Sequence, residues 1–207
     1  MKYFITIMLL MAISMGLGAV NLQLSGGLDF AGESGSMVED VFGYYIENNM
    51  ATTISLQAQN NFQNVLYGLG VDYQVKRQHV ALPEGMHYDL KSSSFIPVYG
   101  VLGYQFLADG ILKPEMFAQL GYSFTDFTYD MYYPEDRLSA KAGLYCGVGM
   151  GVQIQNIIIQ GLYRVNNYKF TSDEWNGSSY DNETYDGRTR QFNISIGYRL
   201  EGLFKNH

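Results

Sequence analysis

The residues with the clearest catalytic potential share one polar segment in the first half of the chain. His79, Glu84, His87 and the run Ser92 to Ser94 supply the residue types of a base, an orienting acid and a nucleophile, which a Ser–His–acid hydrolase requires. Their spacing matches no recognised motif, and histidines in a surface loop are far more often solvated than catalytic. We therefore expect that the protein is not an enzyme.

A second chemically capable group lies near the C-terminal end of the chain. It consists of carboxylates and aromatic residues, namely Asp173, Glu174, Asp181, Glu183 and Asp186 around Trp175, Tyr180 and Tyr185. Carboxylate oxygens can bind Ca²⁺, but this spacing follows no recognised calcium loop, so a solvated acidic surface is the favoured interpretation. The sequence predicts a loop that interacts through Trp175, Tyr180 and Tyr185, and it predicts no metal and no cofactor.

The pattern Gly147-x-Gly149-x-Gly151 superficially looks like a phosphate-binding loop. Such a loop needs a helix directly after it, and this one lies inside an alternating segment instead. We interpret these glycines as positions where a strand curves and where bulky interior neighbours find room. Cys146, the single cysteine, falls on the apolar side of the same segment, where a thiol is inert.

That segment is the clearest structural signal in the sequence. From Leu138 to Ile154 the even positions are apolar, whereas the odd positions carry Ser139, Lys141, Tyr145, Gln153 and glycines. A period of two with one apolar face indicates a strand. Its length exceeds that of ordinary soluble strands and suits a tilted membrane barrel.

Seven more segments share this alternation. Their apolar rows are Leu22–Phe30, 52–59, Tyr67–Val75, Ile96–Phe106, Met116–Phe124, Ile157–Val165 and Phe192–Leu200. The second of them is the weakest, and 41–47 is a rival for it. The connections alternate between short (60–64, 108–112, 155–156) and long (32–51, 77–94, 130–137, 171–187). This alternation indicates an up-and-down meander with short turns at one end and long loops at the other.

These patterns predict an all-β fold, an eight-stranded antiparallel up-and-down transmembrane β-barrel with short periplasmic turns and long extracellular loops. Eight strands leave room inside only for side chains. The polar faces carry few charges, and isolated buried charges are costly. We therefore predict an interior network of paired charges made of Asp29, Asp72, Lys76, Glu115, Lys141, Arg164, Arg199 and Glu201.

The N-terminal residues and the composition indicate export. Lys2, the apolar stretch Phe4 to Met15 and the small residues Gly16 to Ala19 read as a secretory signal peptide, too short to span a bilayer, which takes roughly 20 residues. We assign residues 1–18 to that signal and 19–207 to one barrel domain. A net charge of -7 argues against nucleic acid as a partner.

The chain resembles a known family in three places. The alternating segment 138–154, the segment from Ile157 that ends Gly161-Leu162-Tyr163-Arg164, and the final strand Phe192–Leu200 are similar to the small outer-membrane β-barrel family that includes opacity-type surface proteins. The resemblance implies insertion by the barrel-assembly machinery, which reads an aromatic residue at the end of the last strand. Here Phe204 keeps the parity of that strand, but Lys205-Asn206-His207 follow it.

Pattern and resemblance together predict a bacterial outer-membrane surface protein with a structural or adhesive role. Its loops would contact lipopolysaccharide, host molecules or neighbouring surface proteins. Three alternatives remain: a narrow porin-like channel, a lipid-modifying outer-membrane enzyme and a soluble exported lipid-binding barrel. Fold-level analogy does not choose a ligand.

Overall fold

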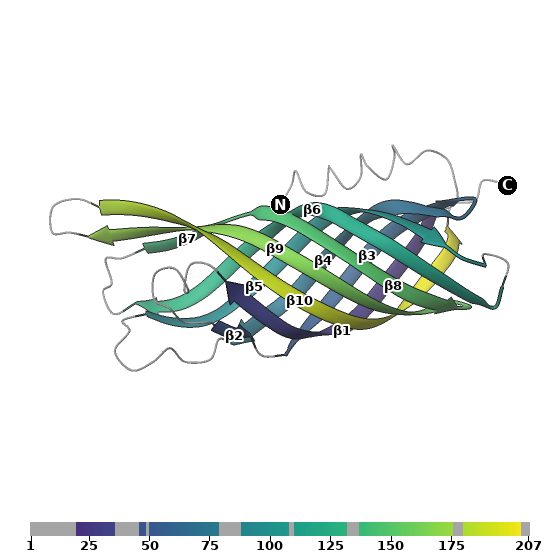
Figure 1. Ribbon diagram of the computed structural model, residues 1–207, viewed down its shortest axis with the longest axis horizontal. Helices are drawn as coiled ribbons and strands as arrows, with labels where there is room; N and C mark the ends of the chain where they lie inside the picture. The colour runs from purple at the N-terminus through teal and green to yellow at the C-terminus, as the bar shows by residue number, and fades with distance from the viewer. Residues whose placement is uncertain are drawn as a thin grey trace.

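A computed structural model of the protein describes residues 20–35, 46–48, 50–78, 88–107, 110–131, 137–175 and 180–203. These residues form ten strands, eight of them long (Figure 1). In chain order they are β1 (Val20–Gly35), β2 (Ile46–Asn48), β3 (Ala51–Phe62), β4 (Val65–Gln78), β5 (Tyr88–Gln105), β6 (Leu112–Met131), β7 (Arg137–Lys141), β8 (Gly143–Ile154), β9 (Ile157–Trp175) and β10 (Tyr180–Leu203).

The eight long strands close into an antiparallel barrel. They follow the order β1, β3, β4, β5, β6, β8, β9 and β10, and β10 pairs with β1 to complete the circle. The short strands β2 and β7 pair with β1 and β9. The prediction of an eight-stranded up-and-down barrel is confirmed. Closure gives every long strand two hydrogen-bonded neighbours, which a spanning sheet requires in lipid.

Strand boundaries differ from the sequence prediction in two ways. β3 confirms the proposed second strand at 52–59; of the rival segment 41–47, residues 41–45 lie outside the described residues and the remainder belongs to β2. Parts of the predicted loops are strand instead, because β5 begins at Tyr88 and the β9–β10 hairpin reaches Trp175 and Tyr180. Polar residues in these stretches predicted loops, whereas the backbone pairing of the strands continues through them.

The predicted continuous strand 138–154 is interrupted at Ala142. In β8, Tyr145 pairs with Asn166, whereas in β7, Lys141 pairs with Lys169. The register therefore slips by one residue between the two strands, and a slip of one residue moves side chains to the other face. Lys141 is exposed beside the exposed Lys169, which corrects its predicted place inside the barrel.

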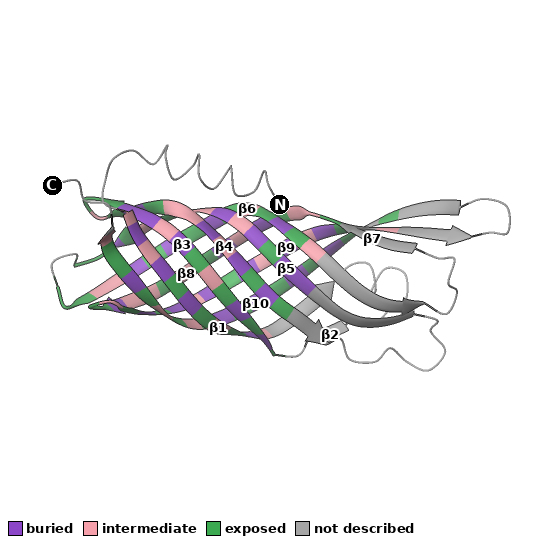
Figure 2. Ribbon diagram, turned by 180° about the vertical axis from the view of Figure 1, so that it is seen from behind, coloured by how far each residue is buried: buried purple, intermediate pink, exposed green. Residues whose placement is uncertain are grey.

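Burial is the inverse of that in a water-soluble protein, as the alternating colours along each strand in Figure 2 show. The outward side chains of the barrel are apolar, including Leu102, Leu120 and Ile196, each more than half exposed. The inward ones are mostly polar, and Gln74, Gln153 and Gln191 are fully buried. The described residues contain no helix long and apolar enough to cross a membrane.

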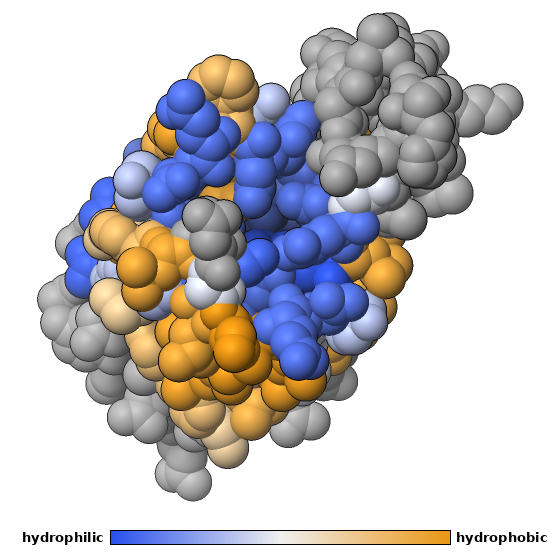
Figure 3. Space-filling view, turned by 90° about the vertical axis from the view of Figure 1, so that its right-hand side faces the viewer, coloured by the Kyte–Doolittle hydropathy of each residue, from blue (hydrophilic) through white to orange (hydrophobic). Residues whose placement is uncertain are grey.

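The short turns gather at one end of the barrel. Gln63-Asn64 joins β3 to β4, and Gln155-Asn156 joins β8 to β9. The end of β10 lies at the same rim, because the Arg199 amide donates to the carbonyl of Asn156 at 2.7 Å. Viewed from this end, hydrophilic side chains fill the middle and hydrophobic ones lie around them (Figure 3). We call it the short-turn end.

Candidate functional site: the barrel interior and the β9–β10 hairpin

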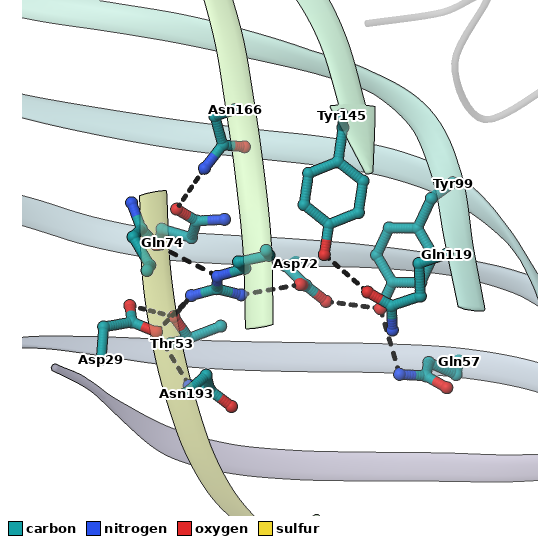
Figure 4. Close-up of polar contacts among 12 residues, drawn as sticks. Asp29, Thr53, Gln57, Asp72, Gln74, Tyr99, Gln119, Tyr145, Asn166 and Asn193 are labelled. Atoms are coloured by element: carbon teal, nitrogen blue, oxygen red, sulfur yellow. Dashed lines mark hydrogen bonds and ion pairs between the residues drawn. The ribbon is translucent and has the colours of Figure 1, made fainter. Parts of the chain in front are cut away.

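The guanidinium of Arg164 on β9 is the centre of the first interior layer. Figure 4 shows its partners Asp29, Thr53 and Asp72 pointing into the barrel. Arg164 is fully buried and contacts two carboxylates, bonding Asp29 through Nη2 and Asp72 through Nη1, the latter at 3.1 Å. Nη2 also donates to Thr53 Oγ1 at 2.6 Å, and Nε donates to Gln191 Oε1 at 3.1 Å. Such charge-assisted bonds are stronger than neutral ones, so this layer fixes four strands to β9.

Two buried tyrosines extend the Arg164 layer across the barrel. The Tyr99 hydroxyl donates to Asp72 Oδ1 at 2.7 Å and accepts from Gln57 Nε2 at 3.0 Å. The Tyr145 hydroxyl donates to Gln119 Oε1 at 2.5 Å. The two rings lie 5.3 Å apart, centre to centre, at 33°, a spacing typical of favourable aromatic pairs.

Arg199 on β10 organises a second layer nearer the short-turn end. It binds Glu115 through two parallel bonds, Nη1 to Oε2 at 3.0 Å and Nη2 to Oε1 at 3.2 Å. It also donates to Gln23 Oε1 at 2.7 Å and to Gln153 Oε1 at 2.8 Å. Gln160 links Glu115 to Gln23, because it donates to Glu115 at 2.9 Å and accepts from Gln23 at 2.9 Å.

An apolar layer separates the two charged layers. It consists of the buried side chains of Val101, Phe117 and Leu162. Leu162 stands between Gln160 and Arg164 along β9, and Phe117 stands between Glu115 and Gln119 along β6, so the layer lies between the charged ones. A Cβ added at Gly149 would lie 2.5 Å from Phe117 Cζ. Because Gly149 has no side chain, the Phe117 ring has room beside it, as predicted from the sequence for the glycine-rich segment.

A third polar level lies beyond Arg164, away from the short-turn end. Asn166 Nδ2 donates to Gln74 Oε1 at 3.3 Å. The other amide atoms of this pair, Gln74 Nε2 and Asn166 Oδ1, are buried without a partner among the described residues. Phe95 and Tyr168, also buried, pack with ring centres 5.6 Å apart. The level thus combines polar and aromatic side chains inside the barrel.

The residues predicted for an interior charge network lie in different places in the structure. Asp29, Asp72, Glu115, Arg164 and Arg199 are all buried and bonded to one another as above. Glu201 lies at the rim, where it accepts from Gln153 at 2.5 Å and faces Lys113 Nζ at 3.6 Å. Lys141 is exposed. Lys76 belongs to β4, and its side chain lies outside the described part of the structure.

Sequence reasoning missed the uncharged members of these layers. Tyr99 and Tyr145 bond to Asp72 and Gln119, and the glutamines Gln23, Gln153 and Gln160 join Arg199 to Glu115. The signal that could have found them is parity, because each lies on the polar face of its alternating strand. Their bonding partners come from other strands and depend on the register, which one sequence does not specify.

The predicted interaction residues lie in the β9–β10 hairpin, which projects past the other strands opposite the short-turn end (Figure 1). Tyr180 pairs with Trp175, and Tyr185 pairs with Phe170. The backbone register therefore places Tyr180 directly opposite Trp175, with Tyr185 farther along β10.

The candidate hydrolase residues lie mostly outside the described part of the chain. His79, Glu84 and His87 lie outside the described residues, and Ser92 to Ser94 lie in β5. Within the described part of the chain, no three His, Cys, Asp or Glu side chains form a group that could hold a metal. Cys146 is half-buried and lies on the outward face of β8.

Comparison with known proteins identifies the fold. The outer membrane protein OprG from Pseudomonas aeruginosa matches with a TM-score of 0.54 and 14% identity, over 89% of this chain and 98% of OprG. The outer membrane protein AlkL, solved in lipid bilayers, matches with 0.55 and 12%, over 89% and 90%. At such identities the likeness shows an eight-stranded barrel fold and nothing about function.

The outer membrane enzyme PagL is also similar, with a TM-score of 0.47 and 15% identity over 85% of this chain and 98% of PagL. That score is too low to support an argument about chemistry. No family model matches the sequence, and a search among curated proteins found no match. The resemblance to opacity-type proteins therefore stays a prediction.

Proposed function

We propose that this chain is a bacterial outer-membrane barrel with a closed interior, which holds the β9–β10 hairpin outside the membrane as a surface for interactions. The observation that carries the membrane location is the inverted burial, with apolar side chains outside and charged layers inside. Exposed apolar area of this extent in water would be a binding or aggregation surface. In a bilayer it faces hydrocarbon, which solvates it.

The height of the apolar belt fits this location. On β9 the outward apolar side chains run from Ile157 to Val165, and on β10 they run from Phe192 to Leu200. Each row covers nine residues, and a tilted strand needs about 9–11 to cross a bilayer. Above the belt the outward positions become polar, beginning with Asn167 on β9 and Arg190 on β10.

Tyrosines at the short-turn end support the same placement. The hydroxyls of the exposed Tyr104 and Tyr198 accept hydrogen bonds from turn residues, Asn64 Nδ2 at 3.3 Å and Asn156 Nδ2 at 2.9 Å. An apolar ring with its hydroxyl at a polar rim is typical of the membrane interface. These tyrosines mark the periplasmic boundary in our proposal.

The filled interior favours a scaffold over a channel. Two charged layers are each bonded across several strands, and Val101, Phe117 and Leu162 lie between them. Ions crossing the barrel would have to break buried ion pairs and pass an apolar constriction. Function then resides in the parts outside the belt, of which the β9–β10 hairpin with Trp175 and Tyr180 is the longest paired part in the described chain.

Accordingly, the proposed partners are lipopolysaccharide and host or neighbouring surface molecules, reached after signal-peptide cleavage and insertion by the barrel-assembly machinery. A labelling experiment on intact cells tests the orientation. We expect a tag placed between Trp175 and Tyr180 to be labelled by an impermeant reagent. A matched tag between Gln155 and Asn156 is expected to react only after the outer membrane is permeabilised. The reverse pattern would refute the proposed orientation.

Two further measurements test the location and the closed interior. The protein is expected in the membrane fraction, with a gel mobility in mild detergent that changes on boiling. Recovery in the soluble fraction without such a shift would support a secreted lipid-binding barrel instead. In planar bilayers we expect no stable conductance, and regular single-channel openings would establish the porin-like alternative.

A further inference from the structure

Exposed cations gather on one wall of the barrel, directly above the apolar belt. Of the seven Lys and Arg side chains that the structure describes, Arg164 and Arg199 are buried and Lys113 lies at the short-turn end. The other four are exposed on β7, β9 and β10, and we call them the basic rim: Lys141, Lys169, Arg188 and Arg190. This concentration stands out in a chain with a net charge of -7.

The strand register places these cations next to one another. Lys141 pairs directly with Lys169, which in turn pairs with Asp186. Directly opposite side chains have Cβ atoms about 5 Å apart, and like charges at that distance repel each other. The arrangement of Lys141 and Lys169 is therefore unfavourable by itself, and an anion held between them would remove the repulsion.

Arg188 is held in place beside the two lysines. Asn167 Nδ2 donates to the carbonyl of Leu144 at 3.0 Å, which orients the Asn167 side chain. Its Oδ1 then accepts from Arg188 Nε at 3.0 Å. The bond uses Nε and leaves the terminal guanidinium nitrogens of the exposed Arg188 without a hydrogen bond to any described side chain, so they can donate to an anion. Guanidinium groups suit phosphate because they can donate two parallel bonds.

Acidic neighbours reduce the positive charge of the rim without cancelling it. Asp186 Oδ1 lies 3.5 Å from Lys169 Nζ, with both side chains well exposed at 80% and 60%, so this ion pair is solvated and weak. Among the side chains that the structure describes on this wall, four cations stand against one carboxylate, that of Asp186.

Directly below the rim the wall is apolar. Leu144, Tyr163 and Phe192 are all exposed on the outward face of β8, β9 and β10. A molecule bound at the rim would thus meet cations at the headgroup level and apolar side chains at the hydrocarbon level. Anionic lipid headgroups offer the matching chemistry, since each Lys or Arg near a charged membrane surface contributes about 1 kcal/mol.

We propose that the basic rim binds the phosphate groups of a glycolipid in the outer leaflet, with its acyl chains along the apolar wall of β8, β9 and β10. The proposal rests on the proposed outer-membrane location and names one partner for it. The phosphates take the place between Lys141, Lys169 and Arg188, and the lipid stays beside the base of the projecting hairpin.

Native mass spectrometry of the full-length folded barrel, released from detergent micelles, provides the test. The probes are bis-phosphorylated lipid A and the same glycolipid with its phosphates removed. We expect the phosphorylated probe to bind more tightly, and Lys169→Gln and Arg188→Gln each to weaken it about fivefold, which corresponds to about 1 kcal/mol per cation. The double variant should weaken it more than either single variant and at most about 25-fold, because two cations that share one anionic partner do not contribute additively.

Lys113→Gln is the matched control, since it makes the same charge change at the short-turn end. Equal binding by wild type and Lys169→Gln, equal loss in Lys113→Gln, or equal binding of the dephosphorylated probe would each overturn the proposal. Displacement by inorganic phosphate as efficiently as by lipid A would also overturn it, because the site would then select phosphate alone. Each variant is first checked for the boiling-dependent mobility shift, so failure of the barrel itself is seen separately.

Discussion

Arg164→Met is the substitution that most directly tests the interior network. It removes the only guanidinium of the first layer while leaving Asp29 and Asp72 buried. Breaking a buried ion pair by deleting one partner costs about 3–5 kcal/mol, because an uncompensated charge remains in the interior. Asp29 keeps its bonds from Thr53 and Asn193, and Asp72 keeps its bond from Tyr99. We therefore expect a loss of about 3 kcal/mol in the free energy of unfolding, at the lower end of that range.

Removing the charge of a carboxylate from the same layer, instead of the arginine, is predicted to lower the free energy of unfolding by less. The described buried side chains contain three carboxylates, Asp29, Asp72 and Glu115, against two guanidinium groups, a net charge of -1. Asp72→Asn brings that balance to zero and keeps an oxygen that can accept from Tyr99, while Arg164 keeps Asp29. The loss of one charge-assisted bond sets the cost at about 1.5 kcal/mol. Replacing Arg164, Asp29 and Asp72 together by Met, Asn and Asn should recover about 2 kcal/mol of the Arg164→Met loss, because the unpaired charges disappear.

Urea titration of the full chain folded into lipid vesicles measures these differences. The folded fraction is obtained from the mobility of unboiled samples, and far-ultraviolet circular dichroism provides an independent probe. The change in free energy follows from the midpoint when the slope is unchanged. Two results would refute the reasoning: a loss below about 1 kcal/mol in Arg164→Met, or an equal loss in Asp72→Asn. The first result would mean that water or mobile ions compensate the carboxylates inside the barrel, and the second that the lost bond, not the unpaired charge, determines the cost.

Three more predictions use the same folded protein. Gly70→Ala places a Cβ 2.5 Å from Tyr99 Cε2 and should destabilise the barrel by about 1–3 kcal/mol through overpacking, whereas Gly26→Ala, whose Cβ meets no atom within 4 Å, should stay within about 0.5 kcal/mol in the same titration; equal effects would contradict the packing argument. Phe117→Ala should lower the free energy of unfolding by about 3–5 kcal/mol by leaving a cavity in the apolar layer, and a loss below about 1 kcal/mol would show that the layer is loosely packed. Cys146 in vesicles should react with a membrane-impermeant maleimide only after the barrel is unfolded, and rapid reaction in the folded state would place this wall of β8 in water.

The sequence was sufficient for the fold and for which face of most strands lies inside. Strict alternation assigns Asp72 and Gln74 to one side of β4 and Tyr73 to the other, and the structure agrees. The sequence did not predict which side chains bond to one another inside the barrel. Arg164 bonds to Asp29 and Asp72, which are 135 and 92 residues away, and these partners depend on the stagger between strands that the hydrophobic pattern leaves open.

Lys141 shows the same limit on a smaller scale. Its parity in the segment 138–154 placed it with the inward Tyr145, but the interruption at Ala142 moves it outward beside Lys169. A single extra residue in one strand has no signature in the alternation when small residues such as Ala140, Ala142 and Gly143 surround it. The sequence therefore did not predict the basic rim, because Lys141 joins the other exposed cations only when it lies outside the barrel.

The inverted burial also determines where the stability of this fold can come from. In water, an outward belt that exposes Leu102, Leu120 and Ile196 would favour collapse or association, and the polar interior supplies little hydrophobic gain. A closed ladder of backbone bonds and the two arginine-centred layers must therefore hold the barrel together, and in the proposed membrane location lipid solvates the belt. It follows that the interior bonds specify register as much as they stabilise, because Arg164 and Arg199 meet their carboxylates only in one stagger of the strands. A barrel without these interior bonds would keep its outer surface, but its interior would no longer favour that stagger of the strands.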